Sequence, residues 1–211
     1  MSDSESSAKR WAEWANRIRG LADTGLALCE NHFDRDRYEK LREIALAMSA
    51  DLAGAPLDEL RGLLPLEPGY VTPKVDVRGA IFEGERVLLV REAMDGLWTL
   101  PGGWADVGDS PREAVEREIR EESGYLSRAT KLAAAYDRSR HDHPPQAVYV
   151  YKLLFVCERT GGAPATSTET LAVDFFPLDA LPPLSRVRIT EAQIRRLYEH
   201  HRHPEWPTEF D

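Results

Sequence analysis

Three glutamates in one short segment are the strongest chemical signal in the sequence. Glu118, Glu121 and Glu122 lie in a stretch, 111–123, whose residues favour a helix. At ~100° per residue, the three carboxylates fall within about 100° of the helix circumference, beside an apolar stripe. Like charges so placed repel one another, and partial burial adds to that cost. Mg²⁺ or Mn²⁺, which prefer hard oxygen ligands, would relieve the repulsion; the alternative is a solvated acidic face balanced by arginines of the same helix.

The helix that carries these glutamates has clear start and stop signals. Ser110 is a favourable N-cap, Pro111 suits the first helical position, and Gly124 suits a left-handed C-terminal cap. Shortly before the helix, Gly102 and Gly103 would let a ligand or metal approach the backbone closely. A glycine-rich loop followed by a capped helix with three acids on one side predicts a site for a metal-bridged diphosphate.

Length, composition and charge exclude several classes of protein. A chain of 211 residues suits one domain of catalytic size with a small attachment, and 42% hydrophobic residues allow a packed core. The net charge of −9 argues against a nucleic-acid binder that uses a basic surface. The longest apolar runs are far shorter than the ~20 residues of a membrane helix, and the polar N-terminal segment lacks the apolar stretch of a signal peptide. With two cysteines and no disulfide framework, we expect a cytoplasmic protein.

The first third of the chain predicts helices. They are expected over 7–30, 34–53 and 56–64, where apolar residues recur at helical spacing. Helices totalling roughly 65 residues make a poor free-standing core, so their exposed tryptophans and leucines need a partner surface. We predict a helical domain over 1–66 that forms a homodimer, with packing against the rest of the chain as the alternative.

The rest of the chain, 67–211, predicts a second domain of mixed strands and helices. Strands are expected over 75–82, 87–90, 130–136, 147–157 and 171–176, and helices over 111–123 and 190–203. Strands mixed with two helices favour an α/β sandwich with a mixed sheet.

The segment around the glutamates resembles the Nudix box, Gly-x5-Glu-x7-Arg-Glu-U-x-Glu-Glu-x-Gly-U, where U is bulky and apolar. The match runs from Gly103 to Tyr125 and departs from the pattern at one position, where Asp109 stands in place of glutamate. The helical N-terminal region and the run 98–104 resemble a bacterial subgroup with an added N-terminal helical domain. The resemblance implies a Nudix-type α/β/α sandwich with a mixed sheet over 67–211.

This resemblance implies hydrolysis of a nucleoside diphosphate linked to another moiety, with Mg²⁺ or Mn²⁺ as cofactor. Water would attack one phosphorus and release a nucleoside monophosphate and a phosphorylated partner. Within the subgroup, CDP-choline is the first expected substrate and ADP-ribose the second. An RNA-processing exonuclease or pyrophosphohydrolase is the alternative function, followed by a nucleotide-sensing regulatory domain.

The resemblance also assigns roles to residues of the box. Glu118, Glu121 and Glu122 would bind the metal together with the backbone carbonyl of Gly103. Arg117 would orient these carboxylates, because Glu121 is its i+4 neighbour on the helix.

Other roles are less specific. Asp109 would support the junction between loop and helix, and Glu169, in a loop rich in threonine and serine, is a candidate general base or metal ligand, with a surface acid as the alternative. Box glutamates, Glu121 and Glu122 included, are the other candidates for the base. The residues expected to contact the substrate are Arg78, Arg91, Trp98 and Trp104.

Overall fold

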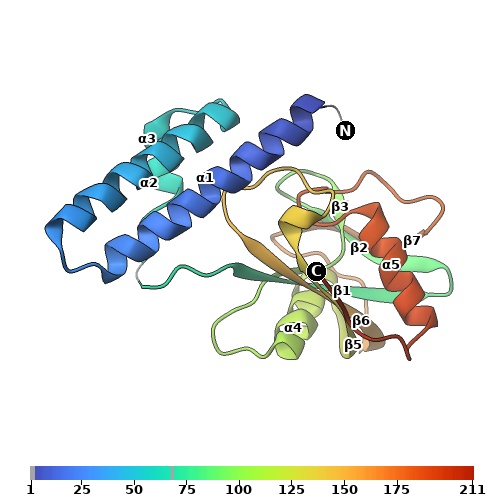
Figure 1. Cartoon of the computed structure of the whole chain (residues 1–211). Helices are drawn as coiled ribbons and strands as arrows, with labels where there is room; N and C mark the ends of the chain where they lie inside the picture. The colour runs from blue at the N-terminus through green and yellow to red at the C-terminus, as the bar shows by residue number, and fades with distance from the viewer. Residues whose placement is uncertain (1–2, 68) are drawn as a thin grey trace. The chain divides into compact units, whose positions relative to one another are not determined.

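The chain forms two compact units (Figure 1). The computed structural model describes residues 3–67 and 69–211. One unit contains the chain up to Pro73 together with 144–149, and the other contains 74–143 with 150–211. We expected the boundary between residues 66 and 67. The segment before Pro73 instead belongs with the helices, where the Val71 N–H donates to Thr24 Oγ1 at 3.1 Å.

The first unit contains three helices, as predicted: α1 (Asp3–Leu28), α2 (His32–Ala53) and α3 (Leu57–Leu63). α1 and α2 run side by side over most of their length (Figure 1). The side chain of Asn31 caps α2 by accepting from the Phe33 N–H at 2.8 Å. Gly54 caps the C-terminal end of α2 with a φ of 63°, a conformation that suits glycine.

A buried carboxylate joins the parts of this unit. Asp23 is fully buried and binds Arg19 at 3.3 Å and Arg42 at 2.8 Å. Arg42 also donates to the Leu64 carbonyl, and Arg19 to the carbonyl of Ala147. The second of these bonds, to a residue remote in sequence, explains why 144–149 belongs to the helical unit. The strand predicted over 147–157 therefore begins later.

The second unit is built on a mixed sheet with the strand order β3-β2-β1-β6-β5-β8. β1 and β6 are parallel, β5 and β6 are antiparallel, β4 pairs with β1, and β7 pairs with β2. The strands are β1 (Lys74–Glu83), β2 (Arg86–Glu92), β3 (Trp98–Thr99), β4 (Gly102–Trp104), β5 (Tyr125–Asp137), β6 (Val150–Gly162), β7 (Thr170–Pro177) and β8 (Glu209–Phe210).

Two helices cover the two faces of this sheet, which confirms the predicted α/β/α sandwich (Figure 1). α4 (Pro111–Ser123) buries Val115 and Ile119 against one face. α5 (Glu191–Arg202) buries Ile194 and Leu197 against the other. Alternation along β1 and β6 supplies apolar residues to both layers. A 3₁₀ turn, Arg138–Arg140, follows β5.

The prediction missed the shortest strands. β3 and β8 have two residues each and β4 has three, too few for an alternating pattern to be visible. β4 includes Gly102 and Gly103, which we expected in a loop. Within the described residues, no helix is long and apolar enough to cross a membrane.

Candidate active site

The start of α4 is fixed by a capping box at Ser110, the N-cap residue predicted from the sequence. Ser110 Oγ accepts from the Glu113 N–H at 3.3 Å, and a Glu113 carboxylate oxygen accepts from the Ser110 N–H at 2.9 Å. At the other end, Gly124 adopts the left-handed conformation, with a φ of 75°. These caps set the helical register and thereby the direction of the three glutamates.

Gly102 and Gly103 allow β4 to lie against β1 and α4. Gly102 has a φ of 144°, and a Cβ there would meet the Val77 carbonyl oxygen at 2.0 Å. A Cβ on Gly103 would lie 2.9 Å from a carboxylate oxygen of Glu118. Gly102 is therefore required for close approach to the neighbouring strand, whereas a side chain at position 103 would only displace the flexible end of Glu118.

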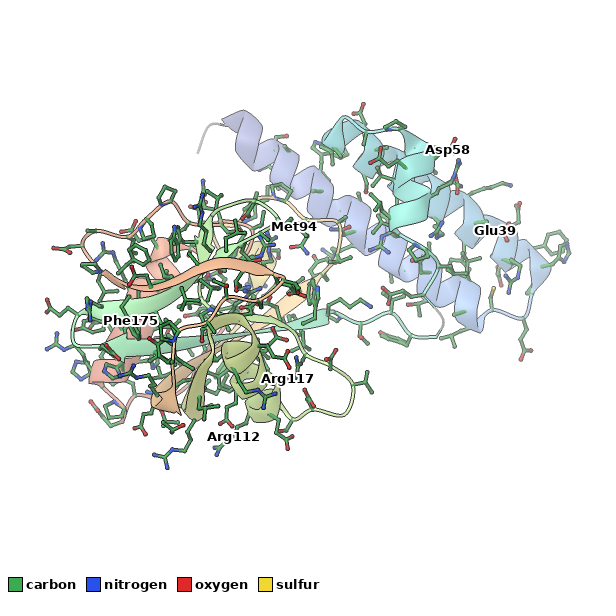
Figure 2. All side chains as sticks on the ribbon, turned by 180° about the vertical axis from the view of Figure 1, so that it is seen from behind. Glu39, Asp58, Met94, Arg112, Arg117 and Phe175 are labelled. Atoms are coloured by element: carbon green, nitrogen blue, oxygen red, sulfur yellow. The ribbon has the colours of Figure 1, made fainter. Side chains whose placement is uncertain are left out.

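A cavity of about 750 Å³ opens over this junction. Eight predicted site residues line it: Arg78, Gly103, Trp104, Arg117, Glu118, Glu121, Glu122 and Glu169. The lining also includes Met94, which Figure 2 labels together with Arg117 of α4. The structure thus brings the box glutamates, the glycine segment and the loop acid into one site.

Glu122 is the most buried acid of the box. Only 5% of it is exposed, and one of its carboxylate oxygens accepts from the Gly102 N–H at 2.8 Å. Burial raises the pKa of Glu122 to about 7, against the lowering effects of Arg78 and of this backbone hydrogen bond. The carboxylate is therefore costly to ionise in the absence of a further cation.

Arg117 gathers the other acids around one guanidinium. It binds Asp109 at 2.9 Å, Glu118 at 2.8 Å, Glu121 at 3.2 Å and Asp106 at 3.2 Å. The hydrogen bond with Asp109 is the largest cause of a raised Arg117 pKa. Burial raises the pKa of Glu118, although Arg117 opposes this shift. Arg117 thus partly neutralises the acidic face predicted to repel itself.

The three glutamates do not converge on one point in the structure. Glu118 and Glu121 turn to Arg117, whereas Glu122 turns to the Gly102 N–H. In the part of the chain that the structure describes, no three His, Cys, Asp or Glu side chains are grouped closely enough to form a metal site. The donor chemistry nevertheless fits a hard divalent cation, because three carboxylates line one cavity and the two more buried ones have raised pKa values.

Arg78 reaches the cavity from a buried network of charges. It is 4% exposed, binds Asp76 at 3.0 Å and donates to the Leu100 carbonyl at 3.1 Å. Asp76 in turn binds the fully buried Lys152 at 2.5 Å. The sequence predicts that Arg78 contacts the substrate, but the prediction did not include its partners Asp76 and Lys152. Charged residues within the mainly apolar stretches of β1 (Asp76 and Arg78) and β6 (Lys152) were the signal available.

Glu92 and Arg188 are further cavity residues that sequence reasoning missed. Glu92 is 7% exposed and lies 3.0 Å from Arg188 Nε and 4.0 Å from Arg78 Nη1. Burial raises the pKa of Glu92, and the two arginines oppose that shift. An acid at the end of β2, shortly after its apolar run, was a weak sequence signal for Glu92. No sequence signal pointed to Arg188.

The remaining predicted residues differ in position. Glu169 lines the cavity, and its backbone carbonyl accepts from the Ala93 N–H at 2.8 Å. Trp104 also lines it and is half exposed. Arg91 and Trp98 are not among the lining residues: Arg91 donates to the Gly96 carbonyl, and the Trp98 ring packs against Phe176 with centroids 4.6 Å apart. Their contact with substrate stays a prediction, without support from the cavity.

Comparison with known protein families agrees with the fold. Residues 72–198 match the NUDIX domain, and residues 9–64 match a domain described as "UDP-X-like, N-terminal oligomerisation domain". A Bacillus subtilis (strain 168) protein named putative ADP-ribose pyrophosphatase YjhB is 45% identical over 202 residues, which cover 96% of this chain and 97% of that protein.

Solved structures of other proteins are also similar to this chain. The crystal structure of an ADP-ribose pyrophosphatase from Streptococcus suis 89-1591 is 41% identical, with a TM-score of 0.62, and covers 66% of this chain and 100% of its own. A crystal structure titled UDP-X diphosphatase is 33% identical, with a TM-score of 0.62, and covers 97% of this chain and 99% of its own. The resemblance first seen between Gly103 and Tyr125 thus extends along nearly the whole chain, which belongs to the Nudix hydrolase family.

Proposed function

We propose that this protein is a divalent-metal-dependent diphosphatase that cleaves a nucleoside diphosphate linked to a sugar. The observation that carries the proposal is one cavity lined by three carboxylates of α4, the β4 glycines and the Arg78 guanidinium. Carboxylates suit the cations that accompany diphosphates, and a guanidinium suits phosphate oxygens. Such a lining combines the groups needed to hold a diphosphate.

ADP-ribose is the leading substrate in this proposal. Two proteins at least 41% identical to this chain carry the name ADP-ribose pyrophosphatase, one of them as putative. CDP-choline, which the sequence alone placed first, moves behind it. A quaternary ammonium group favours aromatic faces, and Trp104 is the one aromatic residue among those described that line the cavity.

Glu118, Glu121, Glu122 and the Gly103 carbonyl would hold Mg²⁺ or Mn²⁺. When bound, the metal supplies charge neutralisation for the diphosphate and for its transition state. Release of Glu118 and Glu121 from Arg117 would make these carboxylates available as ligands. Arg117 would keep its contact with Asp109, and that contact is the basis for assigning both residues a supporting role.

Glu169 is the proposed general base. It lines the cavity from a loop, where a carboxylate can reach an attacking water and accept its proton. Glu122 is less suitable because its buried carboxylate already accepts the Gly102 N–H. Glu169→Gln should therefore lower kcat more than it raises KM.

We also propose a homodimer formed through the helical unit. That unit exposes large apolar side chains: Trp11, Trp14, Leu21, Leu28, Phe33 and Ile44. Its family match describes an oligomerisation domain. An apolar surface of this kind favours association with a second copy.

Product analysis tests the activity. The purified chain is incubated with Mg²⁺ or Mn²⁺ and with ADP-ribose, a UDP-sugar, CDP-choline, a nucleoside triphosphate or a short 5′-triphosphate RNA. Metal-dependent release of AMP and ribose 5-phosphate from ADP-ribose is the expected result. Turnover of RNA alone would favour the alternative of RNA processing, which the net charge of −9 disfavours. No turnover of any compound would refute the proposal.

A further inference from the structure

Arg188 is held at the cavity by a segment attached to β3. The Ser185 N–H donates to the Trp98 carbonyl at 2.8 Å, and the Trp98 N–H donates to the Pro183 carbonyl at 3.0 Å. A turn then follows, in which the Arg188 N–H donates to the Ser185 carbonyl at 2.8 Å. The backbone that presents Arg188 is therefore fixed before any substrate binds.

Two acids and a hydroxyl orient one part of the Arg188 guanidinium. Nε lies 3.0 Å from Glu92, while Nη1 donates to Asp95 at 2.8 Å and to Ser185 Oγ at 2.9 Å. Asp95 is itself held by Ser185 Oγ at 2.7 Å. The side chain is thus pre-positioned, which lowers the entropic cost of using it to bind a ligand.

The other part of the guanidinium has a poor acceptor. Among the described residues, the contact of Arg188 Nη2 is the thioether sulfur of Met94 at 3.6 Å, and sulfur is a weak acceptor. Because Met94 (labelled in Figure 2) is 86% exposed, a ligand can easily displace its side chain. Arg188 therefore offers unsatisfied N–H donors at a cavity that it lines.

We propose that Arg188 binds oxygen atoms of the distal group of the substrate, the part beyond the diphosphate. This contact selects a hydroxyl-rich or anionic distal group over a quaternary ammonium group. The inference rests on the proposed function, since it assumes a diphosphate held at the box glutamates. Arg188 contacts Glu92, Asp95, Ser185 and Met94, and this polar setting without an aromatic ring suits a sugar better than a base.

A purely structural role is the competing explanation. Arg188 compensates the charges of Glu92 and Asp95, and its loss would disturb both. That disturbance would affect all substrates alike, because it would not depend on the distal group. A contact with the distal group would instead affect substrates according to their distal group.

The experiment compares Arg188→Gln with wild type on ADP-ribose, CDP-glycerol and CDP-choline. The two CDP compounds share a nucleotide and differ in carrying distal hydroxyls or a trimethylammonium group. Arg186→Gln is the matched control, because Arg186 lies two residues away, binds Asp142 and is not among the cavity-lining residues. Thermal unfolding of each variant reports whether the fold is kept.

We expect Arg188→Gln to lower kcat/KM for ADP-ribose and CDP-glycerol by about 10- to 100-fold, mainly through KM, as for a lost hydrogen bond to a charged group. CDP-choline turnover should change by less than about threefold, and the control should leave all ratios unchanged. An equal loss for all substrates, or no loss, would overturn the inference while leaving the diphosphatase intact. Wild type that hydrolyses none of them would overturn the proposed function, and this inference with it.

Product inhibition of the wild-type enzyme tests the same contact without a variant. Ribose 5-phosphate and phosphocholine are compared as competitive inhibitors of ADP-ribose hydrolysis. The inhibition constant of ribose 5-phosphate should be at least about tenfold lower than that of phosphocholine. Equal inhibition by the two phosphates would contradict a selective role for Arg188, even if Arg188→Gln failed to fold.

Discussion

The burial of Glu122 should make the metal-free protein less stable as the pH rises. Its pKa is about 7 in the folded chain, against an ordinary value of 4.5. The folded state therefore holds this proton over a pH range in which the unfolded chain has lost it. Stability from this group is greatest below pH 4.5 and falls as the pH rises toward and through 7. A shift of about 2.5 units corresponds to about 3 kcal/mol of unfolding free energy once both states are ionised.

Glu122→Gln removes this charge and keeps an oxygen that can accept the Gly102 N–H. In EDTA, the variant should be more stable than wild type by less than about 1 kcal/mol near pH 5 and by about 3 kcal/mol at pH 8. For a chain of this length, the larger difference corresponds to a Tm increase of roughly 10 °C. Thermal unfolding followed by circular dichroism at pH 5, 6, 7 and 8 measures the trend.

Glu121→Gln is the matched control for burial. It removes one charge from the same acidic face, but the Glu121 side chain is 51% exposed. Its effect on Tm should be small, because this side chain loses little of its hydration on folding. A Tm difference between Glu122→Gln and wild type that does not grow from pH 5 to 8 would refute the argument. Equal stabilisation by both variants would instead assign the effect to repulsion along the helix.

Three further variants test the metal ligands, the buried network and the helical unit. Glu118→Gln should reduce kcat by roughly two to three orders of magnitude, since it weakens a metal contribution of several kcal/mol to transition-state stabilisation. Unchanged turnover at saturating Mg²⁺ would exclude Glu118 as a metal ligand. Lys152→Met leaves the buried Asp76 with one cation fewer and should lower the free energy of unfolding by about 3 kcal/mol or more in urea titrations. Lys131→Met is the control: the Lys131 side chain donates to the His203 carbonyl, and its replacement should lower the free energy of unfolding far less. Leu21→Glu places a charge at an exposed apolar position of α1 and should convert the proposed dimer to a monomer, as measured by light scattering. A wild-type chain that is already monomeric would refute the proposed association.

The sequence predicted the box helix well because its signals are local. Ser110 and Gly124 define its ends within fifteen residues, and helical periodicity then places the three glutamates on one side. The charged groups behind the box were missed because they are far apart in the sequence. Arg188 and Asp95 are separated by 93 residues, so only the folded sheet brings them together. A single sequence carries no local pattern for such a pair.

Asp109 shows how one departure from the family pattern is accommodated. The box resemblance calls for glutamate at this position, and a shorter carboxylate could have left Arg117 without its support. In the structure Asp109 reaches Arg117 Nε at 2.9 Å, so the shorter side chain makes the contact directly. Arg117 also holds Glu118 and Glu121. If Glu118 and Glu121 turned from Arg117 to a metal, as proposed above, Arg117 would keep its contact with Asp109, and that contact would still compensate the guanidinium charge.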